Sequence, residues 1–97
     1  MAIIKDNKII GCISLVPYKD GYELGYWLIK EYRHQGIMQE AIKYWTNFAF
    51  ENLTNKIYCG WFEGNEKSKN LQLNLGFKEI GVKYVDDRKE YETILIK

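Results

Sequence analysis

Residues 23–53 read ELGYWLIKEYRHQGIMQEAIKYWTNFAFENL, and this stretch decides the fold. At its start, apolar and other side chains alternate from Tyr22 to Ile29, which is the pattern of a β-strand. After Gly36 the apolar residues recur at the spacing of an α-helix, which we expect to run to Leu53. A short turn, EYRHQG at 31–36, joins the two. The stretch therefore predicts a strand, a tight turn and a long helix.

The turn has the features of an anion site. The first backbone N–H groups of a helix have no partner inside the helix, and the peptide dipoles add partial positive charge there. Such a terminus suits phosphate. Gly36 can adopt a positive φ and let the backbone approach a ligand closely, and the Arg33 guanidinium can pair with a phosphate in two-pronged fashion. Taken alone, the turn also fits a purely structural role.

Two blocks of residues carry a resemblance to a known family. RHQGIM at 33–38 resembles the acetyl-CoA pyrophosphate loop of the GNAT N-acetyltransferases, Q/R-x-x-G-x-G/A, and the Glu40-Ala41 that follows is similar to the Rim-type branch, which acetylates ribosomal proteins. NEKS at 65–68, followed by LGF at 75–77, resembles the N-x-x-S/A…L-G-F helix of the family. The resemblance runs from about Ile9 to Gly81.

Composition limits the function classes. The 97 residues suggest one domain, 1–97, and 46% apolar residues suffice for a core. A net charge of +1 argues against a nucleic-acid surface. No metal-ligand spacing is present, and Cys12 and Cys59 fall in expected strands, as packed thiols of a reducing cytosol. With no run of ~18 apolar residues and no signal peptide, we expect a cytoplasmic protein that binds neither membrane nor metal.

The remaining elements follow from period and turn residues. We expect strands at 2–5, 9–16, 22–29, 57–63, 77–85 and 90–96, and helices at 36–53 and 66–75, with a polar loop at 17–21. Gly60 inside a strand implies close approach of another group, and Gly76 fits a left-handed helix cap. The order β-β-β-α-β-α-β-β gives an α+β fold with a mixed, mostly antiparallel sheet, parallel where the long helix crosses over.

The GNAT resemblance implies the same fold with one departure. Family members usually carry a strand and one or two helices before the first hairpin, and this chain begins at the hairpin. We therefore expect an N-terminally truncated GNAT-like fold whose cofactor half is intact. Uncovered apolar surface and a free strand edge would favour a homo-oligomer, such as a dimer.

The resemblance also implies a cofactor site for acetyl-CoA. Its pyrophosphate would be held by the loop, at Arg33, His34, Gln35, Gly36, Ile37 and Met38. Its pantetheine arm would lie between the third and fourth strands against the backbone of Leu28 and Ile29. The thioester oxygen would meet a backbone N–H of Trp27 or Leu28. Asn65 would cap the second helix and contact the cofactor.

Two residues are candidates for proton transfer. Glu23 is the expected base for the incoming ammonium, and the alternative is a solvated strand glutamate. Many GNATs carry a Tyr as acid at the position of Gln72, which cannot serve. The Rim-type branch instead has a Ser, matched here by Ser68, and the alternative is that Ser68 only supports the helix start.

Three functions remain open. The first is N-acetyl transfer from acetyl-CoA to a primary amine, either a protein N-terminus or a small amine. The second is a truncated CoA-binding module that is inactive alone or needs a partner chain. The third is a small α+β domain without a ligand, which two motifs in register disfavour.

Overall fold

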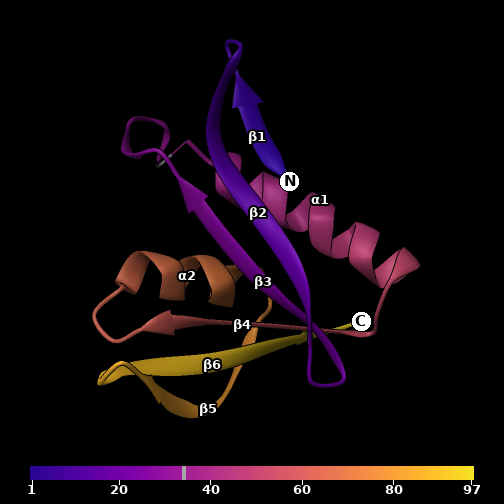
Figure 1. Ribbon diagram of the computed structural model, residues 1–97, viewed down its shortest axis with the longest axis vertical. Helices are drawn as coiled ribbons and strands as arrows, with labels where there is room; N and C mark the ends of the chain where they lie inside the picture. Colours follow the sequence, from indigo (N-terminus) through magenta and orange to yellow (C-terminus); the bar gives the residue numbers. More distant parts are fainter. Residues whose placement is uncertain (34) are drawn as a thin grey trace.

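A computed structural model of the chain describes residues 1–33 and 35–97. Six strands form one sheet in the order β1-β2-β3-β4-β6-β5 (Figure 1). The strands are β1 Ala2–Lys5, β2 Lys8–Tyr18, β3 Gly21–Leu28, β4 Lys56–Phe62, β5 Lys78–Val85 and β6 Arg88–Ile96. The helices are α1 Ile37–Asn52, α2 Glu66–Asn74 and a single 3-10 turn at Lys30–Tyr32. The element order predicted from the sequence is confirmed, and so is the parallel pairing of β3 with β4.

Two boundaries predicted from the sequence are wrong. The segment 17–21 is not a loop, because β2 continues through Pro17 to Tyr18 and only Lys19-Asp20 turn. Pro17 faces Tyr22, and it lies beyond the part of β2 that β1 covers. Tyr18 and Gly21 close the hairpin, so the alternation of the ladder makes Pro17–Tyr22 a pair without hydrogen bonds, where a missing N–H costs nothing. Likewise β6 starts at Arg88, because Asp86 and Asp87, both at positive φ, complete the turn.

The buried core joins α1 to the sheet. Met38, Ile42, Thr46 and Ala49 recur about once per turn and form the buried stripe of α1. The apolar residues of this stripe belong to one cluster with strand residues and Phe77, namely Ile10, Ile13, Leu24, Leu28, Ile57 and Cys59. The helix is therefore held against the middle of the sheet, with its first turn beside the end of β3.

Two glycine predictions from the sequence are confirmed. A Cβ at Gly60 would lie 2.7 Å from the carbonyl oxygen of Tyr91 on β6, so the close approach is that of the neighbouring strand. Gly76 has φ +96 at the end of α2, and the next residue, Phe77, is almost fully buried.

The pairing of β3 with β4 is unusually short. It consists of Tyr22 opposite Ile57 and Glu23 opposite Tyr58, after which the two strands diverge (Figure 1). Asp20 closes this end, since its carboxylate accepts hydrogen bonds from Lys56 Nζ and Tyr58 Oη, each at 2.5 Å. These bonds, that from Lys56 foremost, lower the pKa of Asp20 to about 2. The sheet is thus fastened at one end of β3 and open at the other.

Gly21 controls how closely the fastened end can approach. A Cβ at this position would collide with the carbonyl oxygen of Lys56. We predict that Gly21→Ala lowers the free energy of unfolding by about 1–3 kcal/mol, because the strands must separate to make room. The measurement is urea unfolding at neutral pH.

Gly81→Ala is the matched control. Gly81 also lies in a strand, but a Cβ there would meet no atom within 4 Å. We expect a change within about 0.5 kcal/mol. Equal effects of the two variants would contradict the close contact between Gly21 and β4.

Candidate functional site

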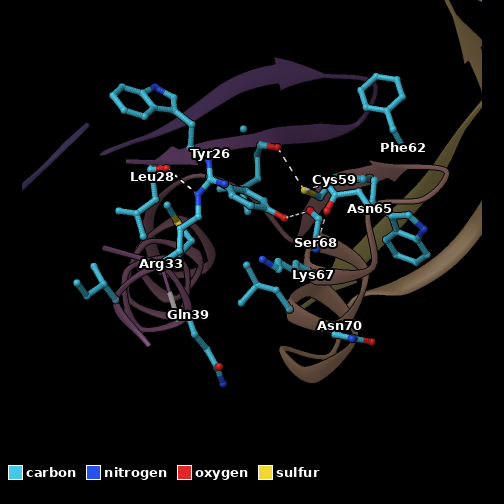
Figure 2. A pocket seen from close by; sticks show the side chains of 18 of the residues that line it. Tyr26, Leu28, Arg33, Gln39, Cys59, Phe62, Asn65, Lys67, Ser68 and Asn70 are labelled. Atoms are coloured by element: carbon cyan, nitrogen blue, oxygen red, sulfur yellow. Dashed lines mark hydrogen bonds between the residues drawn. The ribbon is translucent and has the colours of Figure 1, made fainter. Parts of the chain in front are cut away.

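A cleft of about 780 Å³ occupies the space where β3 and β4 diverge. Its walls come from β3, the loop that follows it, the first turn of α1, β4 and α2, and Glu90 of β6 closes one side. Figure 2 shows Arg33 and Gln39 on the α1 side of this cleft and Asn65, Ser68 and Asn70 on the α2 side. The sequence motifs at 33–38 and 65–68 therefore lie on opposite walls of one cavity.

The first turn of α1 brings backbone N–H donors to the cleft. Gly36 precedes the helix at φ +76, and among the described residues no side chain caps this terminus. The first helical bond runs from Glu40 N to Gly36 O, at 3.1 Å. The N–H groups of the three residues before Glu40 therefore have no partner within the helix, and all three residues line the cleft: Ile37, Met38 and Gln39. This terminus can accept a phosphate group.

The rest of the loop is arranged around the end of β3. Arg33 Nε donates to Leu28 O at 3.1 Å, which ties the turn to the strand while the exposed guanidinium lines the cleft. The Gln35 side chain is directed elsewhere, with bonds to Glu31 O at 3.3 Å and Lys5 Nζ at 3.4 Å. Gln35 does not line the cleft, and His34 lies outside the described residues.

The backbone of β3 presents alternate residues to the cleft. Ile29 N donates to Ile10 O of β2 at 2.7 Å, so in an antiparallel ladder Trp27 also directs its N–H and C=O toward β2. The intervening residues, Tyr26 and Leu28, point theirs the other way, toward the cleft. Of the backbone groups predicted from the sequence, the geometry thus favours Leu28 over Trp27 and Ile29.

Where the strands part, a thiol makes the last link between them. Cys59 Sγ on β4 donates to Leu24 O at 3.4 Å. Burial raises the pKa of Cys59 to about 12, so the thiol stays protonated and keeps its role as a donor. This agrees with the packed-thiol reading of the sequence.

A buried polar network forms the α2 wall. Tyr26 Oη and Ser68 Oγ are hydrogen-bonded, and Figure 2 shows the two side chains reaching toward each other. Gln72 Nε2 donates to Tyr26 Oη at 3.0 Å, and the fully buried Thr93 donates to Gln72 Oε1 at 2.8 Å. Asn65 Oδ1 accepts from Ser68 N at 3.2 Å, which is the helix cap predicted for Asn65.

Sequence reasoning missed Tyr26. It alternates with Leu24 and Leu28 on the buried side of β3, so it was indistinguishable from a core aromatic. A signal existed in Gln72, whose amide on an apolar helix face needs polar partners once it is buried. The partner could not be identified before the strands and α2 were placed.

Glu23 lies in the cleft at the end where β3 and β4 are still paired. Its Oε2 is 3.9 Å from Lys83 Nζ on β5. Lys83 also contacts Glu90 at 3.3 Å and Glu92 at 3.5 Å. Burial alone would lower the pKa of Lys83, but the hydrogen bond and charge of Glu90 outweigh it, so the pKa lies above its ordinary value. Neither Glu90 nor Lys83 was predicted at this site from the sequence.

Within residues 1–33 and 35–97, no group of three or more His, Cys, Asp or Glu side chains is arranged to hold a metal ion. The same part of the chain contains no helix long and apolar enough to span a membrane. The features that characterise the candidate site are its cleft, its backbone donors and its polar wall.

Comparison with protein families decides the identity. A family model described as an acetyltransferase (GNAT) domain matches residues 1–78. The chain belongs to the GNAT acetyltransferase family. YdaF of Bacillus subtilis (strain 168), provisionally named a ribosomal N-acetyltransferase, is 34% identical over an alignment of 83 residues that covers 81% of this chain and 45% of that protein. This GNAT chain thus spans less than half the length of its curated relative.

Solved structures confirm the GNAT fold. The ribosomal-protein-S5-alanine acetyltransferase from Vibrio fischeri has a TM-score of 0.87 at 26% identity, over 94% of this chain and 56% of that one. A GNAT family acetyltransferase from Elizabethkingia anophelis, solved with acetyl-CoA bound, has a TM-score of 0.88 at 16% identity, over 99% of this chain and 74% of that one. At the latter identity the similarity concerns the fold alone.

Proposed function

We propose that residues 1–97 form one GNAT domain that transfers an acetyl group from acetyl-CoA to a primary amine, either a protein N-terminus or a small amine. The observation that carries this proposal is the cleft between β3 and β4, with the first turn of α1 at its mouth, where no side chain of the described residues caps the helix. Family membership supports the reaction class, and the cleft supports this location for it.

The residues present fit acetyl-CoA. The N–H groups of Ile37, Met38 and Gln39 suit the pyrophosphate, with the Arg33 guanidinium beside them. The cleft-facing backbone of Tyr26 suits the amides of an extended pantetheine arm, in the manner of strand addition. A cavity of about 780 Å³ is within the usual range for ligand pockets. Bound there, acetyl-CoA supplies a thioester that an amine can attack.

The chain's own residues would carry out the proton transfers. Glu23 would accept a proton from the incoming ammonium, directly or through water. The Leu28 N–H would stabilise negative charge on the thioester oxygen. Ser68 Oγ, on the opposite wall, would give a proton to the sulfur that leaves. Asn65 would keep Ser68 in place through the helix cap.

The arrangement of charges bears on the acceptor. Glu23 and Glu90 both line the cleft, and Lys83 lies within 3.9 Å of each carboxylate. A cationic amine entering here would compete with Lys83 for these carboxylates. We therefore propose a positively charged acceptor. The free thiols of Cys12 and Cys59 suit the reducing cytoplasm, which is where we propose that the reaction takes place.

A CoA-binding module without activity is the second candidate. The ion pair between Lys83 and Glu23 favours it, because the Glu23 carboxylate already has a cationic partner and must leave it to meet an incoming amine. In this case a partner chain would have to complete the acceptor side. Binding and turnover must therefore be measured separately.

Gly36→Ala tests the cofactor site. A left-handed backbone costs an alanine about 1–2 kcal/mol, so the loop should relax and misdirect the first N–H groups of α1. Each hydrogen bond to a charged group contributes roughly 1.5–3 kcal/mol, so we predict that acetyl-CoA binds at least tenfold more weakly by titration calorimetry. With acetyl-CoA at about 100 times its dissociation constant, the wild-type protein should unfold at a temperature on the order of 10 °C higher than without ligand.

Gly64→Ala is the control for Gly36→Ala. Gly64 has φ +92 and equally open surroundings, but it does not line the cleft. The variant should lose similar stability and keep its affinity for acetyl-CoA. Equal losses of affinity in both variants would show that backbone strain, and not the position of the loop, controls binding.

Glu23→Gln separates catalyst from binding module. We predict that acetylation of an amine acceptor falls by ~10²-fold or more while acetyl-CoA affinity stays within about twofold, because the amide keeps the shape but cannot take a proton. The assay measures release of CoA thiol and, separately, calorimetric binding. Unchanged turnover would remove Glu23 as the base. Binding without turnover in the wild type would establish the module instead.

We also propose that the chain is a homo-oligomer, such as a dimer. Its two edge strands expose apolar side chains, with Ile4 on β1 66% exposed and Tyr84 on β5 72% exposed. Exposed apolar edges tend to pair with another copy. We predict that light scattering gives the mass of a dimer. A charge placed on the edge strand that forms the dimer, by Ile4→Lys on β1 or Val82→Lys on β5, should convert the dimer to a monomer. A monomer at all concentrations would contradict this proposal.

A further inference from the structure

We propose that Tyr26 is the proton source behind Ser68, in a hydrogen-bonded chain that runs from Thr93 through Gln72 and Tyr26 to Ser68 and points into the cleft. This inference rests on the proposed function and goes beyond it, because it assigns a role to two side chains, those of Tyr26 and Gln72, that the acetyl-transfer scheme leaves unused. All four side chains are hydrogen-bonded to one another in sequence.

The first step is the orientation of the Gln72 amide. The buried Thr93 hydroxyl donates to Gln72 Oε1 at 2.8 Å. On the other side, Gln72 Nε2 lies 2.7 Å from the carbonyl oxygen of Gly60, which can only accept. The Gly60 carbonyl requires the amide nitrogen on the cleft side, which leaves the amide oxygen toward Thr93 on β6. Gln72 therefore faces Tyr26 as a donor.

The two protons of the Gln72 amide nitrogen determine the direction of the next hydrogen bonds. A side-chain amide has two N–H groups, and the Gly60 carbonyl takes one. The other goes to Tyr26 Oη at 3.0 Å, which is closer than Ser68 Oγ at 3.2 Å. Either hydroxyl could donate in the Tyr26–Ser68 pair, but Gln72 Nε2 can only donate to Tyr26 Oη, so we assign the Tyr26 proton to Ser68 Oγ, the acceptor bonded to it among the described residues. The Ser68 hydroxyl proton is left to point into the cleft, which Ser68 lines.

The third step is chemical. A serine hydroxyl is a weak acid, so it can deliver a proton only if the oxygen is reprotonated as it does so. Ser68 O–H would break as an S–H bond forms on the leaving sulfur, and Tyr26 O–H would break as Ser68 O–H forms again. No electrons are exchanged, and Tyr26 regains its proton from water in the cleft. Until then, the hydrogen bond from Gln72 Nε2 stabilises the negative charge on the Tyr26 phenolate.

Burial suits Tyr26 to this role. It raises the pKa of Tyr26 above its ordinary value of 10, against the smaller opposing effects of the Ser68 and Gln72 hydrogen bonds. The phenol therefore stays protonated at neutral pH, where a carboxylate base is ionised. Tyr26 acts through Ser68 and is thus a positioning and proton-supplying residue.

Tyr26→Phe tests the relay, because it keeps the ring and removes only the hydroxyl. We expect kcat to fall by about 10- to 100-fold while KM for acetyl-CoA stays within twofold. Adding Ser68→Ala should cost no more than the stronger single variant, since both residues serve one step. Tyr44→Phe, at an exposed tyrosine of α1 outside the cleft, is the control and should match the wild type.

A second readout needs no acetyl-CoA. Proteins labelled with ¹³C at tyrosine Cζ are titrated by NMR, and Tyr26 is assigned from Tyr26→Phe. We expect Tyr26 to titrate above the exposed tyrosines, and Ser68→Ala to raise its pKa further, because the phenolate loses a donor. The pH dependence of kcat/KM reports groups that titrate in the free enzyme. The fall of kcat/KM at alkaline pH should therefore follow the pKa of Tyr26 and should be absent in Tyr26→Phe. A purely structural tyrosine would leave this fall in place.

The outcomes separate the two proposals. A wild type that transfers acetyl groups while Tyr26→Phe stays within threefold of its kcat overturns the relay alone. A Tyr26 resonance that titrates with the exposed tyrosines and ignores Ser68→Ala also overturns it. A wild type that binds acetyl-CoA but transfers nothing overturns the proposed transfer, and the relay with it.

Discussion

The short parallel pairing of β3 with β4 is the constraint on which the site depends. Two residue pairs join the strands next to the β2–β3 hairpin, and beyond them the backbone of β3 has no strand partner on that side among residues 1–33 and 35–97. Elsewhere in a sheet, backbone N–H and C=O groups without a partner strand would be a liability. Here they line a cleft whose mouth is the first turn of α1. The hydrogen bonds of Asp20 thus hold β3 and β4 together at one end of β3, and the two strands are separated at the other end, at Leu28.

The rest of the fold holds the two strands apart. On one side α1 packs Met38 and Ile42 into the core, which places its N-terminus beside the end of β3. On the other side α2 is fixed to β4 and β6 through Gln72, whose amide bonds Gly60 and Thr93. A hydrophobic residue at Gln72 would fill the space equally well but could not hold the Tyr26 and Ser68 hydroxyls in a fixed direction. Polar groups are retained here at a cost in burial that an apolar wall would avoid.

The sequence predicted the fold better than the site. The change from strand to helix period after Gly36 located the central unit, and the turn residues located most boundaries. Pro17 was misjudged because its effect depends on whether the residue falls at a hydrogen-bonded pair of the ladder, which only the register decides. Gly36 and Asn65 were read correctly because their roles are local, one being a positive φ and the other a helix cap.

The contacts that sequence reasoning could not reach join residues far apart in the chain. Lys83 meets Glu23 across 60 positions, and Gln72 meets Tyr26 across 46. No periodicity records such pairs, because each partner has an ordinary place in its own element. The choice between Leu28 and its neighbours as the cleft-facing N–H also required the register of β2 against β3.

The central claim is that the open edge of β3 and the first turn of α1 bind one ligand. The most direct measurement is a backbone amide NMR titration of the wild-type chain with acetyl-CoA. The account predicts that the largest shifts fall on the amides of Tyr26, Leu28, Ile37, Met38 and Gln39, while Trp27 and Ile29, which are bonded to β2, move little. Shifts that fall on Trp27 and Ile29 instead, or that spare β3 altogether, would contradict it.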